Sequence, residues 1–156
     1  MVDEGGSTRA PPIPVRSRRN IVVEEDATKL QFGDLADGEA LTLTDVNTLL
    51  EAARKAPDVP PPPDNKVYKS TVEYVSTFSN ATPDAVESMR QAFAAHPGFL
   101  NKFEIAQIMY LRPERIEVAI ALIPSLERYS QGDAKETLLQ QLLDDVRNIS
   151  RYGSMA

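Results

Sequence analysis

An apolar stripe near the carboxyl end is the sequence feature that most constrains the fold. Hydrophobic residues recur there with the three- and four-residue spacing of an α-helix: Leu138, Leu139, Leu142, Leu143, Val146 and Ile149. Asp133 and Glu136 precede the stripe as a capping pair, a pattern that marks the start of a helix. We therefore predict a long terminal helix whose apolar face packs against other helices.

Capping residues and prolines divide the preceding sequence into several shorter helices. The expected starts are Thr44, Lys66, Thr82-Pro83-Asp84, the Asn101–Glu104 capping box and Pro113. Pro124 is expected to end the last of these helices, and Ser125 to cap a short turn. Tyr68, Tyr74 and Phe78 fall on or near an apolar stripe, so we predict that they belong to the core.

The sequence thus predicts an all-α protein with an extended amino-terminal segment. We divide it into a disordered tail (1–19), an extended partner-docking segment (20–43), a helix with a proline-rich loop (44–65) and a helical domain (66–152). The tail has too few bulky hydrophobes to offset the entropy of ordering it. The prolines from Pro60 to Pro63 are typical of an inter-helix loop, although a ligand for a proline-binding groove is an alternative.

The amino-terminal segment contains hydrophobic residues with no partner nearby in the sequence. Ile21-Val22-Val23 has the composition of a short strand, but no second strand with hairpin chemistry follows it. Because an isolated strand is unstable, we expect this triplet to be coil or to add to a sheet of another chain. Leu30 and Phe32 also lack helical periodicity. Because these hydrophobic residues have no intrachain core, we predict that residues 21–35 become ordered only against a partner.

Composition limits the chemistry that the chain can perform. Its 156 residues carry a formal net charge of -6 and no cysteine, which disfavours solitary nucleic-acid binding and excludes disulfides and thiolate metal sites. The single histidine, His96, lies in a Pro-Gly turn, and we expect no enzymatic activity, metal site, cofactor or small-molecule substrate. No apolar run is long enough to span a membrane, so an intracellular protein is expected. Three arginines could touch phosphate: Arg112, Arg115 and Arg128. The favoured interpretation is that they form ion pairs with nearby acids, namely Glu114, Glu117 or Glu127.

Three blocks in the second half of the chain resemble one protein family. They are Phe99-Leu100-Asn101-Lys102-Phe103-Glu104-Ile105-Ala106-Gln107-Ile108, then Leu111-Arg112-Pro113-Glu114, then Ala121-Leu122-Ile123-Pro124-Ser125-Leu126-Glu127. They are similar to the fourth subunit of eukaryotic RNA polymerase II and to its counterpart in the archaeal RNA polymerase. Glu24-Glu25-Asp26-Ala27 and Thr71-Val72-Glu73-Tyr74-Val75 extend the resemblance, which covers about residues 21–152. Arg112 departs from the family, in which a cysteine is common at this place.

The resemblance implies a helical fold like that of the helicase-and-RNase-D carboxy-terminal (HRDC) domain. It also implies a non-catalytic subunit that forms the polymerase stalk as a heterodimer with subunit seven, bound to the polymerase core. Such a subunit would support initiation and handle the transcript, and it would contact RNA mostly through the partner. The resemblance also implies a location in the nucleus, and a location in the cytoplasm is a further possibility. We expect partner contacts from two sets of residues: Ile21, Val22, Val23, Leu30 and Phe32, and Phe103, Glu104, Gln107 and Leu111.

Two other functions are compatible with the same residues. The equivalent subunit of RNA polymerase III shares the architecture, although the Glu24-Glu25-Asp26-Ala27 start favours polymerase II. A free-standing HRDC-like nucleic-acid-binding module is the second alternative, and the acidic net charge counts against it.

Overall fold

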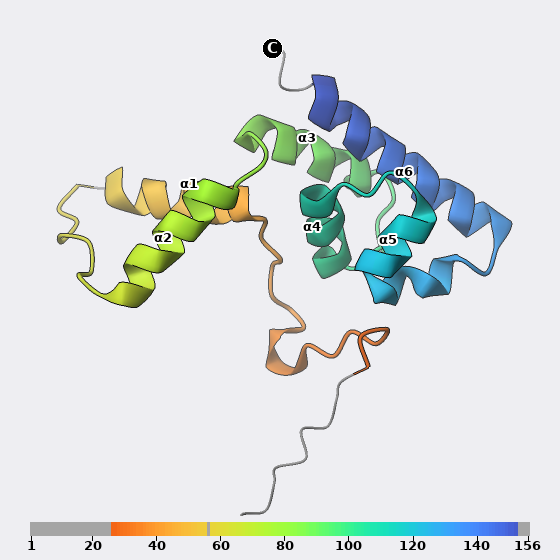
Figure 1. The fold of residues 1–156 in the computed structure, drawn as a ribbon, viewed down its shortest axis with the longest axis horizontal. Helices are drawn as coiled ribbons and strands as arrows, with labels where there is room; N and C mark the ends of the chain where they lie inside the picture. The colour runs from red at the N-terminus through yellow and green to blue at the C-terminus, as the bar shows by residue number, and fades with distance from the viewer. Residues whose placement is uncertain (1–25, 56, 153–156) are drawn as a thin grey trace, which may run out of the picture.

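The computed structural model describes residues 26–55 and 57–152, and this part of the chain is all helical (Figure 1). In chain order the elements are η1 (Gly33–Leu35), α1 (Leu43–Lys55), α2 (Lys66–Phe78), α3 (Pro83–Ala94), α4 (Lys102–Leu111), α5 (Ile116–Leu122), η2 (Pro124–Tyr129) and α6 (Asp133–Tyr152), where η denotes a short 3-10 helix. The all-α prediction is confirmed. The triplet Ile21-Val22-Val23 and the tail of residues 1–19 lie outside the described residues.

The predicted terminal helix is the centre of the core. Leu139, Leu142, Leu143 and Val146 of α6 are at most 2% exposed, and α6 packs against α3, α4, α5 and η2. Figure 1 shows α6 lying along the bundle formed by α3, α4 and α5. The core cluster contains buried residues from Met89 onward and none from α1 or α2.

Two of the predicted helix starts have the predicted hydrogen bonds. The Thr82 hydroxyl accepts a bond from the Ala85 amide at 3.2 Å, with Pro83 in the first helical position of α3. Asn101 and Glu104 form a complete capping box at the start of α4. These local bonds satisfy amide groups that the helix itself leaves without acceptors, so the sequence pattern determines where each helix begins.

Two other starts differ from the prediction. Helix α1 begins at Leu43, because Thr42 and Asp45 cap it reciprocally: the Thr42 amide donates to Asp45 Oδ2 at 2.8 Å and the Asp45 amide to Thr42 Oγ1 at 3.3 Å. Helix α5 begins at Ile116 rather than Pro113, because the chain leaves α4 through Arg112 in the left-handed region at φ 49°.

Helices α1 and α2 pack on each other and project as a hairpin to one side of the bundle (Figure 1). The proline-rich segment is the exposed loop of this hairpin, and Arg54 Nη1 donates to the Pro60 carbonyl across it at 2.9 Å. The prediction that Tyr74 and Phe78 are core residues is wrong: they are 54% and 50% exposed, because only the Val75 side of α2 is buried within the hairpin.

Polar contacts join the hairpin to the bundle. Arg90 of α3 pairs with Asp45 of α1 at 3.0 Å, and the Thr44 hydroxyl donates to the Ala81 carbonyl at 3.2 Å. Arg112, at the end of α4, donates from Nη2 to the Asn80 carbonyl at 2.6 Å. The hairpin therefore joins the bundle through these polar contacts and through the packing of α1 against α3, and it contributes no residue to the central core cluster.

Candidate partner-binding groove

Helix α4 has a buried face and an exposed apolar face. Ile108 and Met109 are buried in the core, whereas Phe103 and Leu111 are 41% and 40% exposed. Gln107 lies four residues from each of these two and is half-buried. Residues four apart share one side of a helix, so Phe103, Gln107 and Leu111 form a continuous outer stripe.

A buried carboxylate fixes the start of α4. Glu104 is fully buried, and its Oε1 accepts the Ser125 hydroxyl at 2.6 Å. Its Oε2 accepts the Asn101 amide at 2.9 Å and Arg128 Nη2 at 2.7 Å. These bonds tie α4 to η2 and hold the outer stripe, including the neighbouring Phe103, in a defined orientation.

Arg128 belongs to the same cluster and remains partly exposed. Burial alone would lower the pKa of Arg128, but hydrogen bonds to Tyr129 and Glu104 and the attraction of the Glu104 carboxylate raise it. Its guanidinium lies 4.7 Å from the centre of the Tyr129 ring. The expected pairing of Arg128 with Glu114, Glu117 or Glu127 is therefore wrong, and so is the expected role of Ser125 as a cap of a turn.

The amino-terminal segment packs against one end of the stripe. The Phe32 and Phe103 rings meet edge to face with centres 5.4 Å apart, and Leu30 and Phe32 line a hollow shared with Phe103 and Gln107. The segment begins in a tight turn in which hydrogen bonds from Thr28 and Lys29 lower the pKa of Asp26 to about 2. Phe32 therefore has one ring contact within the chain, although neither ring belongs to the central core cluster.

An apolar groove of about 470 Å³ follows along the same stripe. We call it the α4 groove; its lining residues are Ala40, Leu41, Thr42, Leu43, Tyr74, Phe103, Ala106, Gln107, Tyr110 and Leu111. Leu41 is 47% exposed, and Tyr74 contributes an exposed ring from α2 that lies 4.6 Å, centre to centre, from Phe78. Three segments distant in sequence thus expose large hydrophobic side chains into one depression, a surface typical of protein–protein contact.

The structure brings most of the described candidate residues together. Leu30 and Phe32 line one hollow with Phe103 and Gln107, and Leu111 lies further along the α4 groove. Glu104 is the exception, because its carboxylate is buried and bonded within the chain; it supports the groove from behind. Ile21, Val22 and Val23 lie outside the described residues.

Sequence reasoning missed two prominent residues of the groove. Leu41 precedes α1 and carries no helical periodicity, so no sequence pattern distinguishes it. The spacing of Tyr74 predicts a core residue, and only the packing of α2 against α1 shows that its ring faces outward.

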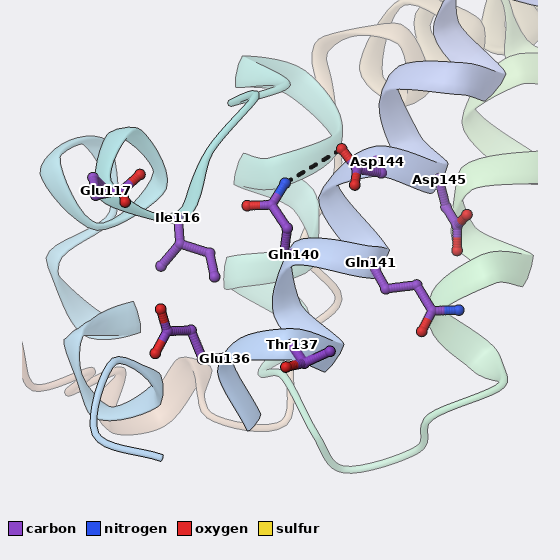
Figure 2. Close-up of a pocket in the computed structure, with 8 residues that line it drawn as sticks. All are labelled: Ile116, Glu117, Glu136, Thr137, Gln140, Gln141, Asp144 and Asp145. Atoms are coloured by element: carbon purple, nitrogen blue, oxygen red, sulfur yellow. Dashed lines mark hydrogen bonds between the residues drawn. The ribbon is translucent and has the colours of Figure 1, made fainter. Parts of the chain in front are cut away.

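A second, larger hollow of about 660 Å³ lies between α5 and α6 (Figure 2). Figure 2 shows acidic side chains around it: Glu117, Glu136, Asp144 and Asp145. The dashed line marks the bond from Gln140 Nε2 to Asp144 Oδ1 at 3.3 Å. In the described part of the chain no group of three or more histidine, cysteine or acidic side chains could hold a metal ion. Four carboxylates around one hollow disfavour the binding of nucleic-acid phosphates there.

A helical bundle with an exposed apolar groove is the kind of surface found in proteins that bind other proteins. No described helix is both long and apolar enough to cross a membrane. A family model described as RNA polymerase Rpb4 matches residues 24–150. Because the match covers most of the 156 residues, the chain belongs to the Rpb4 family of RNA polymerase subunits.

Two named relatives align with the chain along nearly their full lengths. The chain is 28% identical over 135 residues to the DNA-directed RNA polymerase II subunit 4 of Arabidopsis thaliana, an alignment that covers 83% of this chain and 96% of the plant protein. It is also 28% identical over 158 residues to the DNA-directed RNA polymerase II subunit rpb4 of Dictyostelium discoideum, covering 89% and 97% of the two chains. The resemblance inferred from the sequence blocks is confirmed.

Proposed function

We propose that this chain is a non-catalytic, nuclear subunit of RNA polymerase II that pairs with polymerase subunit seven in the stalk. The membership in the Rpb4 family supports the assignment to a polymerase, and the names of the plant and Dictyostelium relatives support polymerase II. In this role the heterodimer supports initiation and handles the transcript, with RNA contacted mainly through the partner. The acidic hollow between α5 and α6 fits a chain that leaves RNA binding to its partner.

The observation that carries this proposal is the exposed α4 groove. Leu41, Tyr74, Phe103 and Leu111 are each 40% or more exposed and come from three segments. Large side chains gathered in this way expose apolar area to water, and a partner surface that covers them removes this cost. We therefore expect the polymerase partner to cover the α4 groove and the adjacent segment that carries Leu30 and Phe32.

The geometry supports a different role in partner binding for each of three candidate residues. Phe103 lies between the two hollows and contacts Phe32, so it links the amino-terminal segment to the α4 groove. Gln107 lines both hollows and offers amide hydrogen-bonding groups within an apolar surface. Glu104 contributes by holding α4 rather than by touching the partner.

Binding to purified subunit seven of the same organism tests the proposal. We expect the wild-type chain to form a stable heterodimer, and Leu41→Glu or Leu111→Glu to weaken it by at least about tenfold, since either change buries a charge in the interface. Leu49→Glu is the matched control, because Leu49 is 56% exposed on α1 and does not line the α4 groove.

Calorimetric titration gives the dissociation constants, and circular dichroism checks that each variant is folded. If the two groove variants bind subunit seven as tightly as the Leu49→Glu control, the groove is not the interface. If the wild-type chain does not bind subunit seven but binds RNA tightly at physiological salt, the stalk assignment itself is refuted.

A further inference from the structure

A hollow separate from the α4 groove lies where the link between α2 and α3 meets the ends of α4 and α6. It has a volume of about 340 Å³, and its lining includes Ser79, Thr82, Arg112 and Ser150. None of the lining residues carries a carboxylate. A cationic group therefore faces hydroxyl groups in a depression without any negative side chain.

Arg112 is held rigidly in this hollow by neutral acceptors. Its Nη1 donates to Ser150 Oγ at 2.7 Å, its Nη2 to the carbonyl and side-chain oxygens of Asn80 at 2.6 and 3.0 Å, and its Nε to the Met109 carbonyl at 3.4 Å. A guanidinium carries five N–H donors, so these four bonds leave one donor of Nη1 available. The bonds fix the direction of that donor without neutralising the charge.

The other two partly buried arginines with shifted pKa values show what Arg112 lacks. Arg90 pairs with Asp45, and Arg128 pairs with Glu104, and in both cases the carboxylate raises the arginine pKa despite burial. Burial lowers the pKa of Arg112, and no described carboxylate opposes the shift. Arg112 is thus a partly buried cation that has no paired carboxylate in the described part of this chain.

Ser79 provides an independent sign of an unfilled position. Its hydroxyl oxygen is buried and, within the described part of the chain, has no hydrogen-bond partner. A buried polar group without a partner is destabilising, and a ligand with acceptor oxygens removes that cost. Ser79 and Arg112 line the same hollow although they are 33 positions apart in sequence.

We propose that this hollow binds one oxyanion of the size of a phosphate or carboxylate group. The anion accepts the remaining N–H of Arg112 and the hydroxyl of Ser79, because charge-assisted bonds of this kind are the strong ones available to a guanidinium. The site is independent of the α4 groove, so it adds a second binding function to the polymerase subunit. By holding Arg112 it also strengthens the connection through Asn80 between the hairpin and the bundle.

An NMR titration of the full-length chain at pH 7 tests this proposal. Sodium phosphate and sodium acetate are added in separate series, with sodium chloride holding the ionic strength constant. We expect saturable shifts of the Arg112 Nε–H and of the amides of Ser79, Asn80 and Ser150 in at least one series. The series that saturates at lower concentration identifies whether the site prefers a phosphate or a carboxylate.

Three variants make the outcome decisive. Ser79→Asp places a carboxylate in the hollow that Arg112 lines and removes none of the groups that accept the four Arg112 bonds, whereas Arg112→Gln removes the cation. Each change is expected to weaken anion binding by at least about tenfold. Arg115→Gln removes the same charge at an exposed position outside the hollow and should bind as the wild type does. If neither anion saturates, or if Ser79→Asp binds as tightly as Arg115→Gln, the proposal is overturned. Should Arg112→Gln fail to fold, the comparison of Ser79→Asp with Arg115→Gln decides alone.

Discussion

Replacement of Glu104 by alanine tests how the surface of α4 is held in place. The carboxylate is fully buried and accepts three hydrogen bonds, from Ser125, Asn101 and Arg128. Alanine removes all three acceptor contacts at once. It leaves the Ser125 hydroxyl buried without an acceptor. It also removes one bond of the α4 capping box, the one that the Asn101 amide donates to the Glu104 carboxylate.

The expected loss of stability follows from these contacts. The unsatisfied Ser125 hydroxyl costs about 1–3 kcal/mol, and the lost cap costs about 0.5–2 kcal/mol. The ion pair with Arg128 adds little, because that side chain is 46% exposed and solvent screens the interaction. We therefore expect Glu104→Ala to lower the free energy of unfolding by about 1.5–5 kcal/mol, a large part of the ~5–15 kcal/mol available to a typical domain.

Urea unfolding followed by circular dichroism measures this loss. Glu104→Gln keeps an acceptor for Ser125 but turns an amide toward Arg128, so its loss should be smaller than that of Glu104→Ala. Glu127→Ala, an exposed residue of the adjoining η2, serves as control and should change stability by less than about 0.5 kcal/mol. A loss below about 1 kcal/mol for Glu104→Ala would show that the cluster does not anchor α4.

Three further perturbations probe other parts of the structure. Leu142→Ala should cost about 2–5 kcal/mol in urea unfolding, because it opens a cavity in the centre of the core; a smaller loss would contradict the assigned packing of α6. Burial alone would raise the pKa of Asp45, but hydrogen bonds from Thr42 and Arg90 lower this pKa below its ordinary value of 3.8. The Asp45 carboxylate therefore stabilises the fold at pH values above the ordinary pKa, and this stabilisation is lost as the pH falls through the lowered pKa. Asp45→Asn should therefore reduce the loss of stability measured between pH 5 and pH 3, and an unchanged pH profile would refute the role of this carboxyl. Phe32→Ala should speed hydrogen exchange in residues 26–35, since it removes the contact with Phe103, whereas unchanged exchange would show that the contact does not order the segment.

Local signals made much of the fold predictable. The stripe from Leu138 to Ile149 repeats at helical spacing over several turns, and α6 lies where this spacing predicts it. The starts of α3 and α4 were also predicted, because a cap forms between residues only three positions apart. The predicted start of α1 was wrong, since both Thr42 and Thr44 have the chemistry of a cap and only the bonds to Asp45 distinguish them.

Tertiary packing determines which side chains form the α4 groove, and the sequence alone does not predict this packing. An apolar stripe shows that a helix face is covered but does not show which element covers it. Helix α2 buries Val75 within a hairpin with α1, and Tyr74 and Phe78 therefore remain exposed beside α4. The α4 groove depends on this arrangement, so its outline could be predicted only for the residues of α4 itself.

The burial of Glu104 explains why two separate sequence blocks occur together in this chain. Adjacent residues of a helix point about 100° apart, so Phe103 lies on the surface while Glu104 is buried beneath it. The Glu104 carboxylate accepts its bond from Ser125, which belongs to the block Leu122-Ile123-Pro124-Ser125-Leu126. The first and third of the three blocks that carried the family resemblance therefore supply the two sides of one buried hydrogen bond. The first block exposes the apolar surface, and the third fixes the helix that bears it, so loss of Ser125 should weaken partner binding although Ser125 itself is buried.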